Sequence, residues 1–95
     1  MSYSVYVIEL EPDDRDEGLT AVYVGQTAHS PEYRFQQHKN GDRSSRVVKR
    51  RGVRLLPSLF PKPPGSYETR TEAEEAEVAW AEVLRSRGYA VYGGT

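Results

Sequence analysis

Apolar residues alternate with polar ones in two stretches near the start of the chain. Residues 3–10 and 19–26 are both rich in Val, Ile and Tyr, which favour half-buried strands. Residues 12–18, between them, are dense in Pro, Asp and Gly, which favour turns. The pattern therefore predicts an antiparallel hairpin with a long acidic loop.

The pattern becomes helical after the second predicted strand. Ser30 fits an N-cap in front of a proline, and Gly41 stands where this first helix should end. A second short, basic helix is predicted over residues 44–51. A third strand is predicted over residues 53–60, and Pro57 makes it a bent strand or an edge strand.

The last helix has the strongest signals. Thr71 begins a capping-box pattern, good helix formers continue to Arg87, and Gly88 ends the helix. Glu77 lies on the flank of its apolar stripe, close to Trp80. A partly buried carboxylate is costly unless it is paired, hydrogen-bonded or bound to a metal. Glu77 therefore either forms an ordinary salt bridge with an arginine or belongs to a functional site.

These elements predict an α+β fold in one domain spanning residues 1–95. We expect a three-stranded antiparallel sheet flanked by helices, to which residues 89–92 add a short edge strand at most. A chain of 95 residues has room for one small core. It contains no cysteine, and no stretch approaches the roughly 18 apolar residues of a membrane span. We expect a cytoplasmic protein with no membrane partner.

Positive charge is concentrated in the middle of the chain although the net charge is −1. Residues 34–54 hold eight Lys and Arg against one acid, while the acids gather in residues 9–17 and 68–82. Such a stripe can follow a phosphate backbone, and an ordinary solvated charged surface is the open alternative. The residues assigned to nucleic-acid contact are Lys39, Arg43, Arg46, Lys49, Arg50 and Arg51.

Four further residues have the chemistry of a phosphodiester site. Arg34 and His38 stand four apart, so they project from one face of the first helix. Tyr6 and Tyr23 would be neighbours in the hairpin. Taken singly, each has an ordinary interpretation, because strand tyrosines are usually packing residues and a lone helical histidine usually lies on the surface.

In order and spacing, these residues resemble the GIY-YIG endonucleases. Ser4-Val5-Tyr6 corresponds to the first motif of that family, and Tyr23-Val24-Gly25 followed by Gln26-Thr27 corresponds to the second. Arg34 to His38 resembles the family's arginine helix, and the helix around Glu77 resembles the one that carries the metal-binding glutamate. Because the resemblance covers nearly the whole chain, we expect a free-standing catalytic domain without appended DNA-targeting domains.

The resemblance implies a metal-dependent endonuclease. Tyr6 would act as the general base or assist it, and Tyr23 would support it. Arg34 would hold a phosphate oxygen, and His38 would be a proton relay or a phosphate donor. Glu77 would bind one Mg²⁺ or Mn²⁺ ion. The reaction would be hydrolysis to a 5′ phosphate and a 3′ hydroxyl, on DNA in preference to RNA.

The chain departs from the family pattern at three points. Ser-Val replaces Gly-Ile in the first motif, Val24 replaces an isoleucine, and the asparagine with which the family often ends is missing. Thr95 or a backbone group would have to replace that asparagine. The alternative is therefore a weakly active or inactive nucleic-acid-binding module of this type. A third interpretation is a structural domain whose basic stripe meets an acidic protein, and a protein partner for targeting stays open.

Overall fold

The fold is built on one sheet of four strands. The computed structural model describes residues 2–41 and 45–94. The two central strands are β1 (Ser4–Leu10) and β2 (Ala21–Thr27). They form the predicted antiparallel hairpin, with a short 3₁₀ turn in the acidic loop. The edge strands are β3 (Gly52–Leu55), antiparallel to β1, and β4 (Ala90–Gly93), parallel to β2. The strand order is β3-β1-β2-β4.

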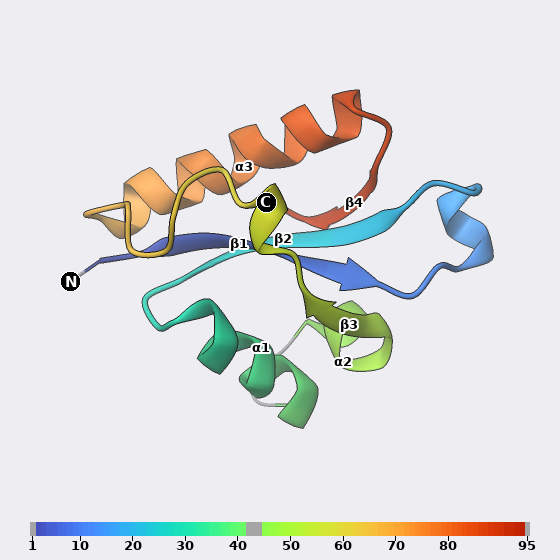
Figure 1. The fold of residues 1–95 in the computed structure, drawn as a ribbon, viewed down its shortest axis with the longest axis horizontal. Helices are drawn as coiled ribbons and strands as arrows, with labels where there is room; N and C mark the ends of the chain where they lie inside the picture. Colours follow the sequence, from blue (N-terminus) through green and yellow to red (C-terminus); the bar gives the residue numbers. More distant parts are fainter. Residues whose placement is uncertain (1, 42–44, 95) are drawn as a thin grey trace.

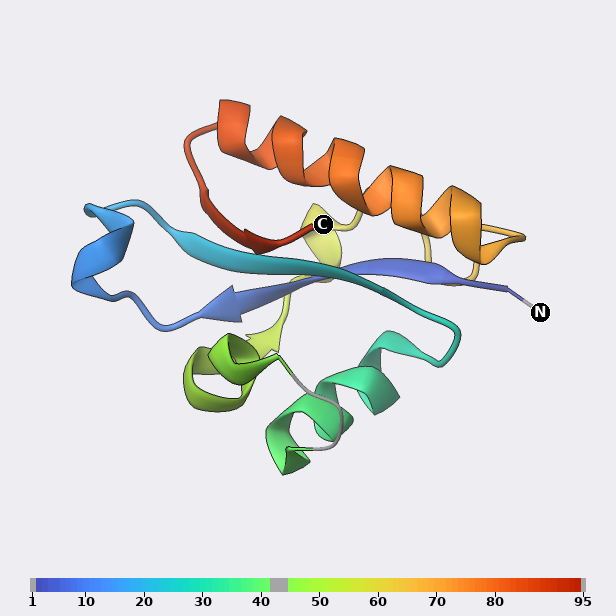
Figure 2. The same ribbon diagram turned by 180° about the vertical axis from the view of Figure 1, so that it is seen from behind.

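Helices cover both faces of this sheet (Figure 1). The long helix α3 (Arg70–Ser86) lies on one face. The shorter helices α1 (Pro31–Asn40) and α2 (Arg46–Arg51) lie on the other, and the view from behind shows the same layering (Figure 2). In the described residues, no helix is long and apolar enough to cross a membrane.

Each face of the sheet has its own hydrophobic core, because successive side chains of a strand point to opposite faces. The core under α3 contains Val5, Val7, Val22, Val24, Ala73 and Leu84. The core under α1 and α2 contains Tyr6, Ile8, Leu10, Ala21 and Val48. Tyr6 therefore belongs to the face that α1 and α2 cover.

The α+β class is confirmed, but the three-stranded antiparallel sheet is wrong in two respects. The predicted edge segment at 89–92 is a full member of the sheet, and it runs parallel to β2 because α3 carries the chain back across the sheet. The third strand is also shorter than the predicted 53–60. It ends at Leu55, and Pro57 begins a 3₁₀ turn, because proline lacks the N–H that a strand ladder needs.

The helix termini follow the capping rules, with one shift in position. The Ser30 hydroxyl accepts the Tyr33 N–H at 3.1 Å, and Gly41 ends α1 in the left-handed conformation. The N-cap of α3 is Thr69 instead of Thr71, and its hydroxyl accepts the Glu72 N–H at 3.1 Å. Thr69 to Glu72 also matches the capping-box pattern, so the sequence contained two registers and the earlier one is used.

Candidate functional site

A hydrogen bond between Tyr6 and His38 lies at the centre of the candidate site. Tyr6 is on β1, opposite Gly25 of β2, and His38 is on the last turn of α1. The Tyr6 hydroxyl lies 2.9 Å from Nε2 of His38, and both side chains are almost completely buried. Thirty-two residues separate them in sequence, so the fold itself creates this contact.

The other ring nitrogen of His38 fixes its tautomer. Nδ1 accepts the Ser45 N–H at 3.1 Å, so it carries no proton. Burial and the positive charge of Arg34 lower the pKa of His38 to about 4, so the ring is neutral at pH 7. The single ring proton is therefore on Nε2, which donates to the Tyr6 oxygen. In this geometry both ring nitrogens of His38 are engaged within the protein, and the ring positions the Tyr6 hydroxyl.

Tyr23 completes an aromatic cluster. Its ring centroid is 5.5 Å from that of His38, in an edge-on arrangement, and 6.4 Å from that of Tyr6. Burial raises the pKa of Tyr23, and a hydrogen bond with the Ser45 side chain partly offsets this. Tyr23 is only half-buried, whereas Tyr6 is 1% exposed. Of the two tyrosines, Tyr23 is thus the more exposed.

Gly25 is required by the position of these rings. A Cβ built on Gly25 would lie 2.5 Å from the Tyr6 hydroxyl oxygen and 3.1 Å from the Tyr23 ring. Real Cβ atoms do not approach other atoms as closely as the first of these distances, so any side chain here would displace Tyr6. The glycine of the Tyr-Val-Gly motif therefore provides the space that the Tyr6 hydroxyl occupies.

Arg34 lies beside Tyr6 and opens onto a polar hollow. Burial raises the pKa of Tyr6 most strongly, and the charge and hydrogen bond of Arg34 only partly offset that increase. Nη1 of Arg34 also donates to Gln37 at 3.2 Å. The adjoining hollow has a volume of about 210 Å³ and is lined by Gln26, Thr27, Ala28, His29, Arg34, Gln37 and Arg70.

Of the seven residues that line this hollow, only Arg34 was predicted as a site residue, and Gln26 and Arg70 are the two most notable additions. Gln26 has a buried Oε1 atom that has no hydrogen-bond partner in the described part of the chain. Arg70 brings a second guanidinium from the start of α3. Gln26 directly follows the second motif, which is the only sequence signal for it. Nothing around Arg70 marks that residue, since it stands inside an ordinary capping sequence.

Glu77 is part of the buried stripe of α3 and not merely its flank. Its exposed fraction is 9%, and burial raises its pKa to about 7, with the Gly94 N–H lowering it and Glu74 raising it. Its charge also raises the pKa of both Tyr6 and Tyr23, so it lies within electrostatic reach of the cluster. None of the ion pairs in the described residues involves Glu77.

Glu77 is the one predicted metal ligand, and it could hold only an ion that keeps most of its waters. The described residues contain no group of three His, Cys, Asp or Glu side chains that would enclose a metal on their own. Mg²⁺ keeps several waters and is commonly held by one or two carboxylates together with substrate phosphate. Glu77 could supply one such carboxylate, and a cation would stabilise its mostly buried charge.

Directly after β4, a backbone N–H group acts on Glu77. The Gly94 N–H donates to Val24 at 3.0 Å and also acts on Glu77. Gly94 has φ +74°, and a Cβ there would lie 2.5 Å from the Cβ of Ala81. Glycine therefore allows the chain to pass directly against α3. Thr95 lies outside the described residues.

The residues assigned to nucleic-acid contact divide into two groups. Arg46, Lys49 and Arg50 are exposed on α2. The Lys39 ammonium donates to the carbonyl oxygens of Lys49 and Gly52, at 3.4 and 2.9 Å, so it fastens α1 to the end of α2. Arg43 lies outside the described residues.

Arg51 is a structural residue, contrary to its assignment to nucleic-acid contact. Its guanidinium pairs with buried Asp16 and donates to the Glu11 carbonyl oxygen at 2.7 and 2.9 Å. It also lies over the Tyr92 ring, 5.1 Å from the centroid, and its side chain is 11% exposed. The spacing of basic residues gave no sign of this, because the partner acid lies 35 positions away.

No protein-family model, curated protein or solved structure matches the chain.

Proposed function

We propose that the protein is a metal-dependent endonuclease of the GIY-YIG type that hydrolyses phosphodiester bonds in nucleic acid, with DNA favoured over RNA. The observation that carries the proposal is the contact between Tyr6 and His38 beside Arg34 and Tyr23. Four residues from three distant parts of the chain meet there, and a poorly solvated carboxylate acts on both phenols. A purely structural core does not need this combination of a base, a phosphate-binding cation and a metal ligand.

The different exposure of the two tyrosine side chains suggests different roles in the reaction. Tyr23 is the more exposed, so in our proposal its phenolate takes the proton of the attacking water. The water oxygen then bonds to phosphorus, the bond to the 3′ oxygen breaks, and that oxygen is protonated by solvent. Tyr6 supports Tyr23 from behind, held by the Nε2–H of His38. This exchanges the roles that the sequence resemblance implies for the two phenols.

Arg34 would bind the phosphate while negative charge builds on it. A planar guanidinium can donate two parallel hydrogen bonds to phosphate oxygens, which lysine cannot do. The polar hollow beside Arg34, with Arg70 on its edge, gives the phosphate a place of suitable size and charge. The same positive charge favours the phenolate form of the neighbouring tyrosines.

Glu77 is the residue that would hold the ion. When bound there, Mg²⁺ or Mn²⁺ would polarise a phosphate oxygen and offset the carboxylate charge that raises the pKa of both tyrosines. Exposed Arg46, Lys49 and Arg50 on α2 would bind the phosphate backbone on the face of the sheet that α1 and α2 cover, which is also the face of Tyr6.

One observation favours a second candidate, a nucleic-acid-binding module without turnover. Tyr6 is 1% exposed, and its hydrogen bond with His38 is as well satisfied as a structural contact would be. In that case the cluster would only hold α1 against β1. The two candidates differ in whether a phenol contributes to cleavage.

The test is cleavage of labelled single-stranded, duplex, flapped and branched DNAs, and of matching RNAs, with Mg²⁺, Mn²⁺ or chelator. We expect metal-dependent products with a 5′ phosphate and a 3′ hydroxyl. The rate should rise by about tenfold per pH unit above neutrality, because burial holds the pKa of both phenols above the ordinary value.

Tyr23→Phe should lower the rate by about 10²-fold or more with little loss of stability. Tyr89→Phe is the matched control, since it removes a hydroxyl from the core under α3, and it should leave cleavage intact. Salt-sensitive binding of these nucleic acids without metal-dependent cutting by the wild-type protein would select the binding module.

A further inference from the structure

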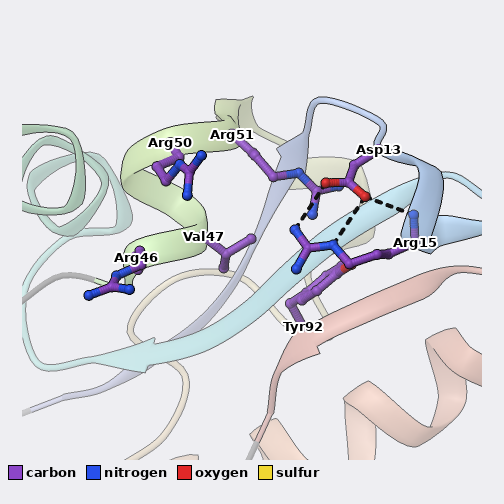
Figure 3. Close-up of a pocket in the computed structure, with 7 residues that line it drawn as sticks. All are labelled: Asp13, Arg15, Arg46, Val47, Arg50, Arg51 and Tyr92. Atoms are coloured by element: carbon purple, nitrogen blue, oxygen red, sulfur yellow. Dashed lines mark hydrogen bonds and ion pairs between the residues drawn. The ribbon is translucent and has the colours of Figure 1, made fainter.

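A hollow of about 420 Å³ lies beside α2, away from the polar hollow of Arg34. Figure 3 shows its lining side chains, which come from α2, from the loop between β1 and β2 and from β4. They are Asp13, Arg15, Arg46, Val47, Arg50, Arg51 and Tyr92. This volume lies within the range of roughly 300–1,000 Å³ that is usual for small-molecule sites.

The charge of this hollow is concentrated on one edge. Arg15 pairs with Asp13 at 2.9 Å, and Arg51 pairs with Asp16 beneath it. Within the described part of the chain, no ion pair involves Arg46 or Arg50. These two exposed residues stand four apart on α2, so their guanidinium groups share one face of the helix. The edge that they form carries two uncompensated positive charges.

The opposite wall is aromatic and rigid. The Tyr92 hydroxyl donates to Asp16 at 2.5 Å, and the Arg51 guanidinium lies over its ring. Half-buried Val47 adds an aliphatic surface between this wall and the basic edge. A wall of one aromatic and one aliphatic side chain opposite a basic edge suits a ligand that joins a ring to a phosphate, which is the chemistry of a nucleotide.

This hollow lies next to the tyrosine cluster. Tyr92 pairs with Tyr23 in the parallel register of β4 and β2, and both pack into the core under α1 and α2. Neighbouring strands are about 4.8 Å apart, and B-form DNA advances about 3.4 Å per nucleotide along each strand. Tyr92 is therefore one or two nucleotide steps from Tyr23.

A second hollow of about 410 Å³ borders the same basic edge and is lined by Gly41, Arg46, Lys49 and Arg50. Arg46 and Arg50 thus stand between two hollows. We propose that the hollow between them and Tyr92 binds one nucleotide unit, with its phosphate on Arg46 and Arg50 and its base or sugar on Val47 and Tyr92. Its assignment to a nucleotide next to the cleaved bond rests on the proposed function.

The test is titration of the ¹⁵N-labelled protein in chelator, so that binding is measured without cleavage. The probes are inorganic phosphate, thymidine 5′-monophosphate and a thymidine trinucleotide. We expect the monophosphate to shift the side-chain Nε–H signals of Arg46 and Arg50 and the backbone signals of Val47 and Tyr92. Inorganic phosphate should bind about tenfold more weakly, because it makes no contact with the apolar wall.

The trinucleotide separates the two sources of such a ligand. Binding at least tenfold tighter than the monophosphate, with added shifts at Tyr23, supports a subsite of a bound strand. Equal affinity for the two supports a pocket for a free nucleotide and removes its link to the cleavage site. Cleavage without these NMR shifts would overturn the proposed nucleotide pocket but not the proposed nuclease activity. NMR shifts without cleavage would support the pocket and overturn the nuclease activity.

Three arginine variants complete the test. Arg46→Ala and Arg50→Ala should each weaken monophosphate binding by about tenfold. Arg85→Ala is the matched control, because it removes the same charge from α3 on the opposite face of the sheet. The proposal is overturned if Arg85→Ala weakens binding as much as Arg50→Ala, or if the monophosphate shifts neither Val47 nor Tyr92.

Discussion

Two buried polar clusters lie under α1 and α2. One contains a charged pair, and the other contains only neutral groups. In the cluster of Asp16, Arg51 and Tyr92, the carboxylate accepts hydrogen bonds from a guanidinium and from a phenol, so its charge is balanced within the protein. In the cluster of Tyr6, Tyr23 and His38, all three groups are neutral at pH 7, and the nearby Glu77 has no ion pair in the described residues.

In our proposal, this difference distinguishes a structural cluster from a functional one. A buried charge without a counter-ion is costly. Asp16 is paired with Arg51, whereas Glu77 has no ion pair in the described residues and receives only the backbone N–H of Gly94. The pKa values show the same contrast, since hydrogen bonding to Tyr92 and Arg51 lowers the pKa of Asp16, whereas burial raises that of Glu77 to about 7. Perturbed groups of the second kind gather at functional sites. In our proposal, the Asp16 cluster stabilises the fold and the tyrosine cluster takes part in the reaction.

The largest effect on stability is expected at Asp16. Asp16→Asn leaves the Arg51 charge almost fully buried without its counter-ion, which should lower the free energy of unfolding by about 3–5 kcal/mol. Asp13→Asn is the control, because it breaks the exposed pair with Arg15, which solvent screens, and should therefore cost far less. Urea denaturation measures both. Equal losses in the two variants would remove the structural role of the Asp16 cluster.

The next effect concerns cleavage and sharpens the role of Arg34. Arg34→Lys keeps the positive charge but loses the planar fork, so we expect the cleavage rate to fall by about 10²-fold with stability nearly unchanged. Single-turnover kinetics on the best substrate measure this. A rate within a factor of three of wild type would show that Arg34 does not hold the reacting phosphate.

A smaller effect is expected in the pH dependence of stability, where two groups oppose each other. Burial lowers the pKa of His38 from 6.5 to about 4 and raises that of Glu77 from 4.5 to about 7. As the pH falls below 6.5, the unfolded state binds the His38 proton first, so this group reduces stability. As the pH falls below 7, the folded state binds the Glu77 proton first, so that group increases it.

The two slopes nearly cancel, so the stability of the wild-type protein should change little between pH 7 and 5. Glu77→Gln should expose a loss of about 2 kcal/mol as the pH falls through this range, and His38→Gln should expose a gain of similar size. Urea titrations at several pH values measure the slopes. The same slope in both variants would contradict the assigned pKa shifts.

The smallest predicted change in stability is at Gly25, which leaves space for the Tyr6 hydroxyl. Gly25→Ala places a Cβ against the Tyr6 hydroxyl and should cost about 1–2 kcal/mol together with most of the cleavage activity. Gly52→Ala creates a comparable clash, with the Val48 carbonyl oxygen, away from the tyrosines. It should reduce stability to a similar extent and leave the rate per folded molecule unchanged. Loss of activity in both variants would point to general unfolding.

Local signals in the sequence predicted much of the fold. The alternating apolar runs, the Ser30 cap and the Gly41 stop correctly predicted the hairpin and the first helix. The sequence did not predict the parallel pairing of β4, because parallel partners are joined by a long crossover and the short segment carries no directional signal. The predicted third strand continued past Pro57, whereas β3 ends at Leu55, before that proline.

The candidate site divides in the same way. Order and spacing predicted Tyr6, Tyr23, Arg34 and His38 as site residues, and the structure brings these four side chains together. The tautomer of His38 depends on a backbone N–H, and the structural role of Arg51 depends on a distant acid, so neither could be inferred from spacing. The greater exposure of Tyr23 likewise depends on packing, which the strand pattern does not encode.

The most direct test of the account compares Glu77→Gln with Glu75→Gln in single-turnover cleavage over a range of Mg²⁺ concentrations. Glu75 lies on the same helix and is exposed, so its substitution removes the same charge from the surface instead of from the buried site. We predict that Glu77→Gln abolishes metal-dependent cleavage while remaining folded, and that Glu75→Gln cuts like wild type. Cleavage by Glu77→Gln at the wild-type rate and the same Mg²⁺ dependence would contradict the assignment of Glu77 as the metal ligand and the nuclease mechanism built on it.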